Sequence, residues 1–153
     1  MFIDVPEESD LDDEAAAWYR RERESWGYLP NYAPAFALRP DVAQAWGNLN
    51  GAIRSHMDRR RYELATIAAA REYRSTYCTA AHSKFLRDEC ADEPTMRALA
   101  ADPGGGELDA TDREGVRLAA KVARDASSVE AADVEHLRAH GLSDAEIVDV
   151  VLA

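Results

Sequence analysis

Apolar residues recur every three or four positions along most of the chain, which is the spacing of amphipathic α-helices. Residues 40–57 place Val42, Trp46 and Leu49 on one stripe, whereas the run 64–70, within a helix expected over 59–73, is apolar on nearly every side. A helix that is apolar all round is typical of the middle of a core. No segment alternates apolar and polar residues as a half-buried strand does. The pattern therefore predicts an all-α fold of seven or eight helices with mostly short connections.

Residues that cap or break helices set the expected element boundaries. Gly27 and Gly141 stop two helices, and capping boxes open two others. The expected helices span residues 11–25, 41–57, 59–73, 76–89, 93–101 and 131–140. Two more helices are expected to begin at Thr111–Glu114 and Ser143–Glu146. A glycine-rich loop is expected at 102–106. A loop with three prolines and one helical turn is expected over 27–40. We divide the chain into an acidic N-terminal arm, residues 1–13, and one all-helical domain, residues 14–153.

Composition and charge narrow the class of protein. The chain has 153 residues, of which 46% are hydrophobic and 31% charged, enough for a core of its own and inconsistent with wholesale disorder. No apolar run approaches a membrane span, so no membrane partner is expected. The formal net charge of −11 would repel a phosphate backbone, so nucleic acid is not an expected partner either. The N-terminus lacks the pattern of a secretory signal and only two cysteines occur, which predicts a cytoplasmic protein with free thiols.

One segment brings together residue types that carry chemistry. Cys78 and His82 are four positions apart on an expected helix, so their side chains share one face. Ser75 is placed to act as the N-cap of that helix, which puts Cys78 in the first turn, where free amides and the positive end of the helix dipole stabilise a thiolate. The imidazole could act as a base, and Glu63, returned by a helix hairpin, could orient it or pass a proton. The same spacing also fits an inert, buried cysteine beside a surface histidine.

Other candidate sites carry weaker signals. His136 and His140 are also four apart, but no third ligand accompanies them, so a helix-end feature is favoured over a zinc site and no metal is expected. The glycines at 104–106 follow no strand and lack the lysine of a phosphate-binding loop, so they are interpreted as a linker. Eight of the twelve aromatic residues lie in the first 46 positions, which is typical of a core or a subunit interface.

The segment from Glu63 to His82 resembles the signature of the alkylhydroperoxidase D (AhpD) and carboxymuconolactone decarboxylase superfamily. In that signature a glutamate precedes a Cys-x-x-Cys motif, and a histidine follows the second cysteine after three residues. Glu63 and His82 match the family glutamate and histidine, and Cys78 matches the peroxide-attacking cysteine. Ser75 stands in the place of the first, resolving cysteine. The similarity covers residues 27–153, and three flanking segments resemble the peroxidase-related branch: Gly27–Asn31, Arg60–Arg61 and Gly141–Ile147.

The resemblance implies an AhpD-like helical fold that assembles into a symmetric homo-oligomer. It also implies an antioxidant oxidoreductase, a peroxidase in which Glu63 and His82 activate Cys78 for attack on a hydroperoxide without any cofactor. This attack produces a sulfenic acid on the attacking cysteine. In family members with both cysteines, the resolving cysteine then closes a disulfide with it. The hydroxyl of Ser75 cannot form a disulfide, and Cys90, twelve helical residues further on, would lie about 18 Å from Cys78. An external thiol reductant is therefore the expected resolver.

Two other functions are open from the sequence. A non-redox enzyme like the carboxymuconolactone decarboxylases would use Glu63 and His82 as acid and base, although that branch usually lacks the cysteine motif. A non-catalytic, redox-sensing oligomer would oxidise Cys78 without turnover. We favour the peroxidase because the chain has Cys78 at the position of the peroxide-attacking cysteine.

Overall fold

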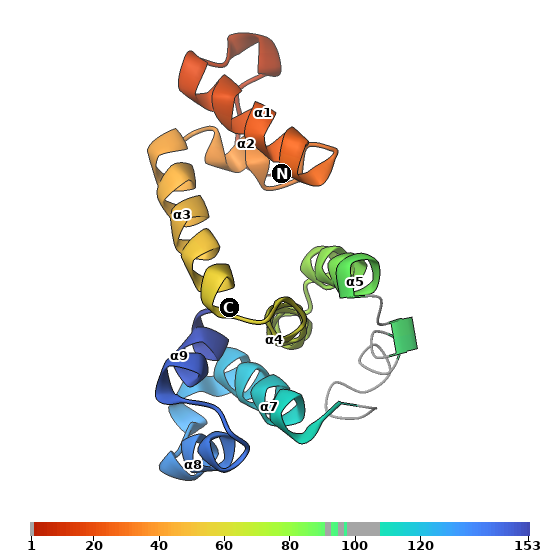
Figure 1. Cartoon of the computed structure of the whole chain (residues 1–153). Coiled ribbons are helices and arrows are strands. Elements are labelled where there is room, and N and C mark those ends of the chain that lie inside the picture. Colours follow the sequence, from red (N-terminus) through yellow and green to blue (C-terminus); the bar gives the residue numbers. More distant parts are fainter. Residues whose placement is uncertain (1, 91–92, 95–96, 98–107) are drawn as a thin grey trace. The chain divides into compact units, whose positions relative to one another are not determined.

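All regular structure in the described residues is helical. The computed structural model describes residues 2–90, 93–94, 97 and 108–153, and within these ranges it contains no strand (Figure 1). The all-α prediction is therefore confirmed. The helices are η1 (Glu8–Asp10), α1 (Asp13–Trp26), α2 (Ala33–Phe36), α3 (Pro40–His56), α4 (Arg59–Glu72), α5 (Thr76–Cys90), α7 (Ala110–Asp125), η2 (Ala126–Ser128), α8 (Ala131–Ala139) and α9 (Asp144–Leu152). No helix in these ranges is long and apolar enough to cross a membrane.

The expected boundaries agree closely with the observed helices. The helix expected over 59–73 is α4, the helix expected over 76–89 is α5, and the single turn expected within 27–40 is α2. Differences of one or two residues at helix ends are ordinary, because helix ends fray. The helix expected over 93–101 lies largely outside the described residues, and the loop expected over 102–106 lies wholly outside them.

The capping predictions are right for the last helix and wrong for α7. Ser143 Oγ accepts the N–H of Glu146, and the Glu146 carboxylate accepts the N–H of Ser143, which closes the capping box of α9. α7 begins before Thr111, and its N-cap is Asp109, whose carboxylate accepts a first-turn N–H at 2.8 Å. The Thr111 hydroxyl instead donates to a backbone carbonyl at 2.8 Å. A negative carboxylate is well suited to the positive end of a helix, so Asp109 takes the capping position.

The chain forms two compact units, Met1–Ala52 and Ile53–Ala153, with the division inside α3. In the first unit, Trp18 packs among aromatic neighbours and donates its indole N–H to a backbone carbonyl at 3.1 Å. The acidic arm is held to α1, because Glu8 forms an ion pair with Arg23 at 2.6 Å. The buried core of this unit consists of Ala15, Trp18, Tyr19, Ala33, Ala37 and Ala43.

Helix α4 is the central element of the second unit. Helices α5 and α7 both pack along it, which explains why its run from Leu64 to Ala70 is apolar on nearly every side (Figure 1). Arg60 and Arg61 of α4 also bind the buried carboxylate of Asp112, and this contact fixes α7 to α4. The buried core of this unit consists of Leu64, Ala65, Ile67, Ala68, Leu86, Leu108, Val116, Leu118, Ala119, Leu137, Leu142, Ile147 and Val150.

A tight reversal joins α4 to α5. Arg74 adopts a left-handed φ of 54°, and the N–H of Ser75 donates to the carbonyl of Ala70 at 2.9 Å, which closes the end of α4. The hydroxyl of Ser75 then accepts the N–H of Cys78 at 3.3 Å, so Ser75 is the N-cap of α5, as predicted. This hairpin returns α5 along α4 and sets the middle of each helix against the other.

Candidate active site

The predicted carboxylate and imidazole meet across the α4–α5 hairpin. Glu63 lies on the buried side of α4 with none of its side chain exposed, and its Oε2 is 2.7 Å from Nδ1 of His82 on α5. A carboxylate is a hydrogen-bond acceptor, so the imidazole donates its Nδ1–H to Glu63. In the neutral tautomer that makes this bond, the second ring nitrogen, Nε2, carries no proton and can accept one.

Cys78 lies one helical turn before His82, on the same face of α5. Its side chain is exposed, so a peroxide in solution can reach the sulfur. Its backbone N–H is bound by Ser75 at the N-terminus of the helix, the position at which the helix dipole favours a negative charge. An accessible thiol therefore lies one helical turn from an imidazole whose Nδ1 is hydrogen-bonded to a buried carboxylate.

The ring of Tyr62 borders the imidazole. The ring of Tyr62 lies 6.2 Å, centroid to centroid, from the imidazole of His82, and Tyr62 itself is buried. His82 keeps 19% of its side chain exposed. The imidazole is thus covered by Tyr62 on the side of α4 and remains partly accessible to solvent.

The sequence analysis missed one charged residue of the site, Arg59. Its Nη2 lies 2.9 Å from Oε1 of Glu63, one helical turn along α4, and its guanidinium lies 5.0 Å from the ring centroid of Phe85. Its Nε lies 3.2 Å from the carboxylate of Glu89. The signal that could have found it is the spacing of four between Arg59 and Glu63 on a helix, which places opposite charges in contact.

The second cysteine is at the far end of α5. Cys90 is partly buried and packs against the core, whereas Cys78 is exposed in the first turn of the same helix. Burial raises the pKa of the Cys90 thiol, and the carboxylates of Glu63 and Asp58 raise it further. Cys90 is therefore a poor nucleophile at neutral pH and is separated from Cys78 by the length of the helix.

The two remaining histidine candidates have other contacts. His140 Nδ1 lies 2.7 Å from the backbone carbonyl of His136, and His136 Nδ1 lies 3.9 Å from the carboxylate of Glu114. Within the described part of the chain, no three His, Cys, Asp or Glu side chains are grouped so as to hold a metal ion.

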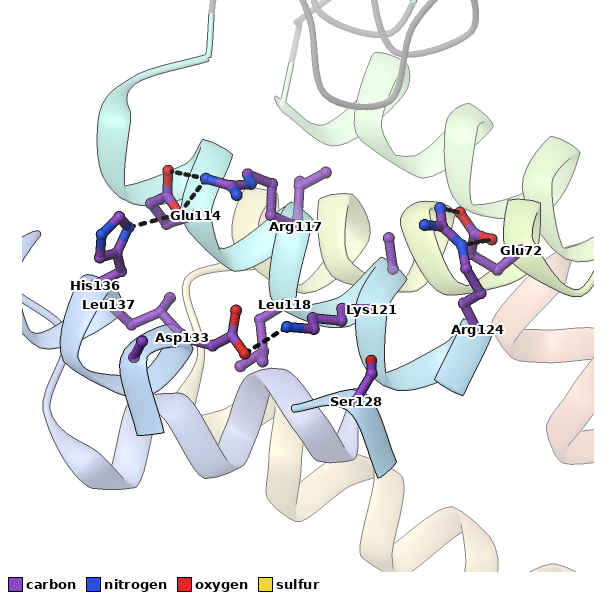
Figure 2. Close-up of a pocket in the computed structure, with 13 residues that line it drawn as sticks. Glu72, Glu114, Arg117, Leu118, Lys121, Arg124, Ser128, Asp133, His136 and Leu137 are labelled. Carbon is purple, nitrogen blue, oxygen red and sulfur yellow. Dashed lines mark hydrogen bonds and ion pairs between the residues drawn. The ribbon is translucent and has the colours of Figure 1, made fainter. Parts of the chain in front are cut away.

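A groove with a volume of about 610 Å³ lies elsewhere in the second unit, along α7 and α8 (Figure 2). Its cations are paired with its carboxylates: Glu72 with Arg124, Glu114 with Arg117, and Asp133 with Lys121. This pairing leaves no excess charge to attract an ion. None of the residues that line the groove belongs to the cysteine site: Glu72, Glu114, Val116, Arg117, Leu118, Ala120, Lys121, Arg124, Ser128, Ala132, Asp133, His136 and Leu137.

Comparisons with known proteins bear on the family and the fold of the chain. The model of the carboxymuconolactone decarboxylase family matches residues 40–102, which include Glu63, Ser75, Cys78 and His82. No curated protein matches the chain.

Two similar crystal structures are peroxidase-related proteins. One, from Ralstonia eutropha JMP134, is described as an alkylhydroperoxidase AhpD core and is 25% identical, with a TM-score of 0.84. The other, from Silicibacter sp. TM1040, is 26% identical, with a TM-score of 0.87. Each match covers 98% of this chain and 80% of the other chain.

A third structure has the same fold and a different activity. It is the debrominase Bmp8, in a cysteine-to-alanine variant bound to 2,3,4-tribromopyrrole, with 16% identity and a TM-score of 0.81. The match covers 99% of this chain and 81% of that one, and at this identity it concerns the fold alone. The family match over residues 40–102 and the two peroxidase-related structures, together with the all-helical fold, support the AhpD and carboxymuconolactone decarboxylase superfamily for this chain.

Proposed function

We propose that this protein is a thiol-dependent peroxidase that reduces hydroperoxides at Cys78 and serves an antioxidant role. The observation that carries the proposal is the 2.7 Å hydrogen bond between His82 and the fully buried Glu63, one turn from an exposed thiol. A carboxylate, an imidazole and a thiol in this order are the parts of a nucleophile and its base. The likeness to peroxidase-related structures supports the same class of reaction.

The first half of the reaction oxidises the cysteine. Nε2 of His82 accepts the thiol proton of Cys78, and the thiolate sulfur attacks the terminal oxygen of the hydroperoxide. The O–O bond breaks, the sulfur gains the hydroxyl as a sulfenic acid, and the alkoxide leaves with a proton returned by His82. The cysteine sulfur is oxidised by two electrons, and the hydroperoxide is reduced to an alcohol.

The second half needs a thiol from outside the chain. Ser75, at the position of the resolving cysteine, carries a hydroxyl that cannot form a disulfide. An external thiol condenses with the sulfenic acid to give a mixed disulfide and water, and a second external thiol releases Cys78 as the free thiol. The reductant is therefore a small monothiol or a thiol protein that can reach the exposed end of α5.

The test is intact-mass analysis after one equivalent of hydroperoxide in the presence of a sulfenic-acid trap. We expect one trapped adduct on the wild type and on Cys90→Ser, and none on Cys78→Ser. Glu63→Gln and His82→Asn should form the adduct more slowly, by about tenfold or more. An adduct that survives in Cys78→Ser, or unchanged rates in both relay variants, would count against the proposal.

A second function is favoured by the family match itself. The matching model describes carboxymuconolactone decarboxylases, and Glu63 with His82 could serve as an acid and base without a thiol. In that case turnover of a lactone or a related acid would survive Cys78→Ser. A redox-sensing protein differs from both, because it would form the sulfenic acid once and consume no further hydroperoxide when thiol is added.

A further inference from the structure

The hydrogen bond from His82 does not by itself supply a positive charge to balance the buried carboxylate of Glu63. Its side chain is completely buried, and a carboxylate in that position keeps its charge only if a counter-charge compensates it. Oε2 receives the hydrogen bond from His82, but a neutral imidazole donates a proton without supplying a charge. Oε1 is buried and forms no hydrogen bond within the described residues.

The cation in contact with Oε1 is Arg59. Its Nη2 is 2.9 Å away, close enough for an ion pair although the angle is not that of a directed hydrogen bond. We propose that Arg59 is the positioning residue that holds Glu63 ionised, with its second oxygen aimed at His82. Arg59 is suited to this role because its guanidinium stays protonated throughout the range in which proteins work.

The surroundings hold Arg59 in place. Its guanidinium carbon lies 5.0 Å from the ring centroid of Phe85 on α5 and 6.0 Å from that of Tyr62 on α4. Its Nε contacts Glu89 at 3.2 Å near the end of α5, and only 31% of its side chain is exposed. These contacts with both helices of the hairpin hold the guanidinium next to Glu63.

The consequence for the cysteine rests on the proposed function. Without Arg59, the buried Glu63 takes up a proton and donates its O–H to Nδ1 of His82. The imidazole proton then moves to Nε2, and the ring can no longer accept the proton of Cys78. Arg59 would therefore control which nitrogen of His82 serves as the base, although it touches neither the sulfur nor the substrate.

The test compares three variants with the wild type by infrared spectroscopy and by the rate of sulfenic-acid formation. Arg59→Gln removes the charge, Arg59→Lys retains it, and Glu89→Gln removes the other carboxylate that contacts Arg59 without replacing either member of the Arg59–Glu63 pair. The infrared band of a protonated carboxyl group reports on Glu63 directly, and it is assigned by its loss in the double variant Arg59→Gln/Glu63→Gln.

We expect the carboxyl band in Arg59→Gln at neutral pH and not in the wild type, Arg59→Lys or Glu89→Gln. Sulfenic acid should form at least about tenfold more slowly in Arg59→Gln and recover in part in Arg59→Lys. Circular dichroism at the same pH checks that each variant is folded. Absence of the band from folded Arg59→Gln would overturn the inference. Presence of the band with an unchanged oxidation rate would support the role of Arg59 and contradict the relay to Cys78.

Discussion

Two cysteines on one helix differ in what they can do because of where they lie on it. Cys78 is exposed in the first turn of α5, next to the Ser75 cap, whereas Cys90 packs against the core at the last residue of the helix. The first position offers access and the favourable end of the helix dipole. The second buries the sulfur near carboxylates, which disfavours the thiolate.

This contrast predicts selective alkylation. Because burial raises the pKa of Cys90, its thiolate fraction at pH 7.5 is smaller than that of an ordinary cysteine, and iodoacetamide should modify Cys78 several-fold faster. Alkylation of Cys90 should increase at a higher pH than that of an ordinary cysteine, because its pKa is raised. Peptide mass mapping against time at several pH values measures both rates. Equal rates at pH 7.5 would show that the environment of Cys90 has no such effect.

Replacement of Ser75 tests whether the absence of a resolving thiol limits turnover. Ser75→Cys recreates the two-cysteine motif, so a disulfide with Cys78 can close and a dithiol can reopen it, and peroxide consumption with a dithiol reductant should rise. The change also removes the hydroxyl cap of α5, at a cost of about 1 kcal/mol. Ser75→Ala is the matched control, because it loses the cap and adds no thiol. No gain in turnover for Ser75→Cys over Ser75→Ala would mean that the absent thiol is not what limits the reaction.

At the scale of elements, α4 is held by polar contacts as well as by its apolar sides. Arg60 and Arg61 converge on Asp112, whose side chain is only 6% exposed, at the start of α7. Arg61 also reaches Glu146 on α9, at 3.6 Å. These contacts lie on the same helix as Glu63, so the orientation of α4 in the core and the placement of the site depend on each other.

Removal of this buried carboxylate should therefore destabilise the second unit. Asp112→Ala leaves two partly buried arginines without their shared partner, and we expect the free energy of unfolding to fall by about 3 kcal/mol. Glu146→Gln is the control, because its ion pair is longer and partly exposed and should cost less than about 1 kcal/mol. Urea unfolding followed by circular dichroism measures both. A loss for Asp112→Ala no larger than that for Glu146→Gln would refute the buried contact as a source of stability.

At the scale of the whole molecule, surface charge and exposed apolar residues have opposite effects on the association of one copy of the chain with another. The net charge of −11 keeps copies apart at long range. Helix α9 nevertheless exposes Val148, Val151 and Leu152, which lie three and four positions apart and share one face. A symmetric oligomer, as the family resemblance implies, would bury such a face at short range.

We accordingly expect a homo-oligomer in solution. Sedimentation equilibrium should give a mass that is a multiple of the 16.9 kDa chain, and salt should favour the oligomer by screening the net negative charge. Val148→Glu should weaken association, whereas Ala139→Glu adds the same charge at an exposed position on α8 and serves as the control. A wild type that sediments as a monomer at micromolar concentration would contradict this expectation.

The sequence alone determined the helical class, most helix boundaries and the membership of Glu63, Ser75, Cys78 and His82 in one motif. Helical periodicity, capping residues and a spacing of four are local properties, so they can be read without knowing what packs against what. The same local pattern predicted Thr111 as the N-cap of α7. It failed there because the hydroxyl of Thr111 has a partner 29 positions away, and Asp109 caps the helix instead.

Only the tertiary structure decided which groups meet across the hairpin. Residues 63 and 82 are nineteen positions apart, and their 2.7 Å contact exists because α5 returns along α4 after the left-handed turn at Arg74. The complete burial of Glu63, and hence its need for the charge of Arg59, depends on both helices at once. The burial of Glu63 and its contact with His82 depend on residues that are distant in sequence, so they arise only when the chain is folded.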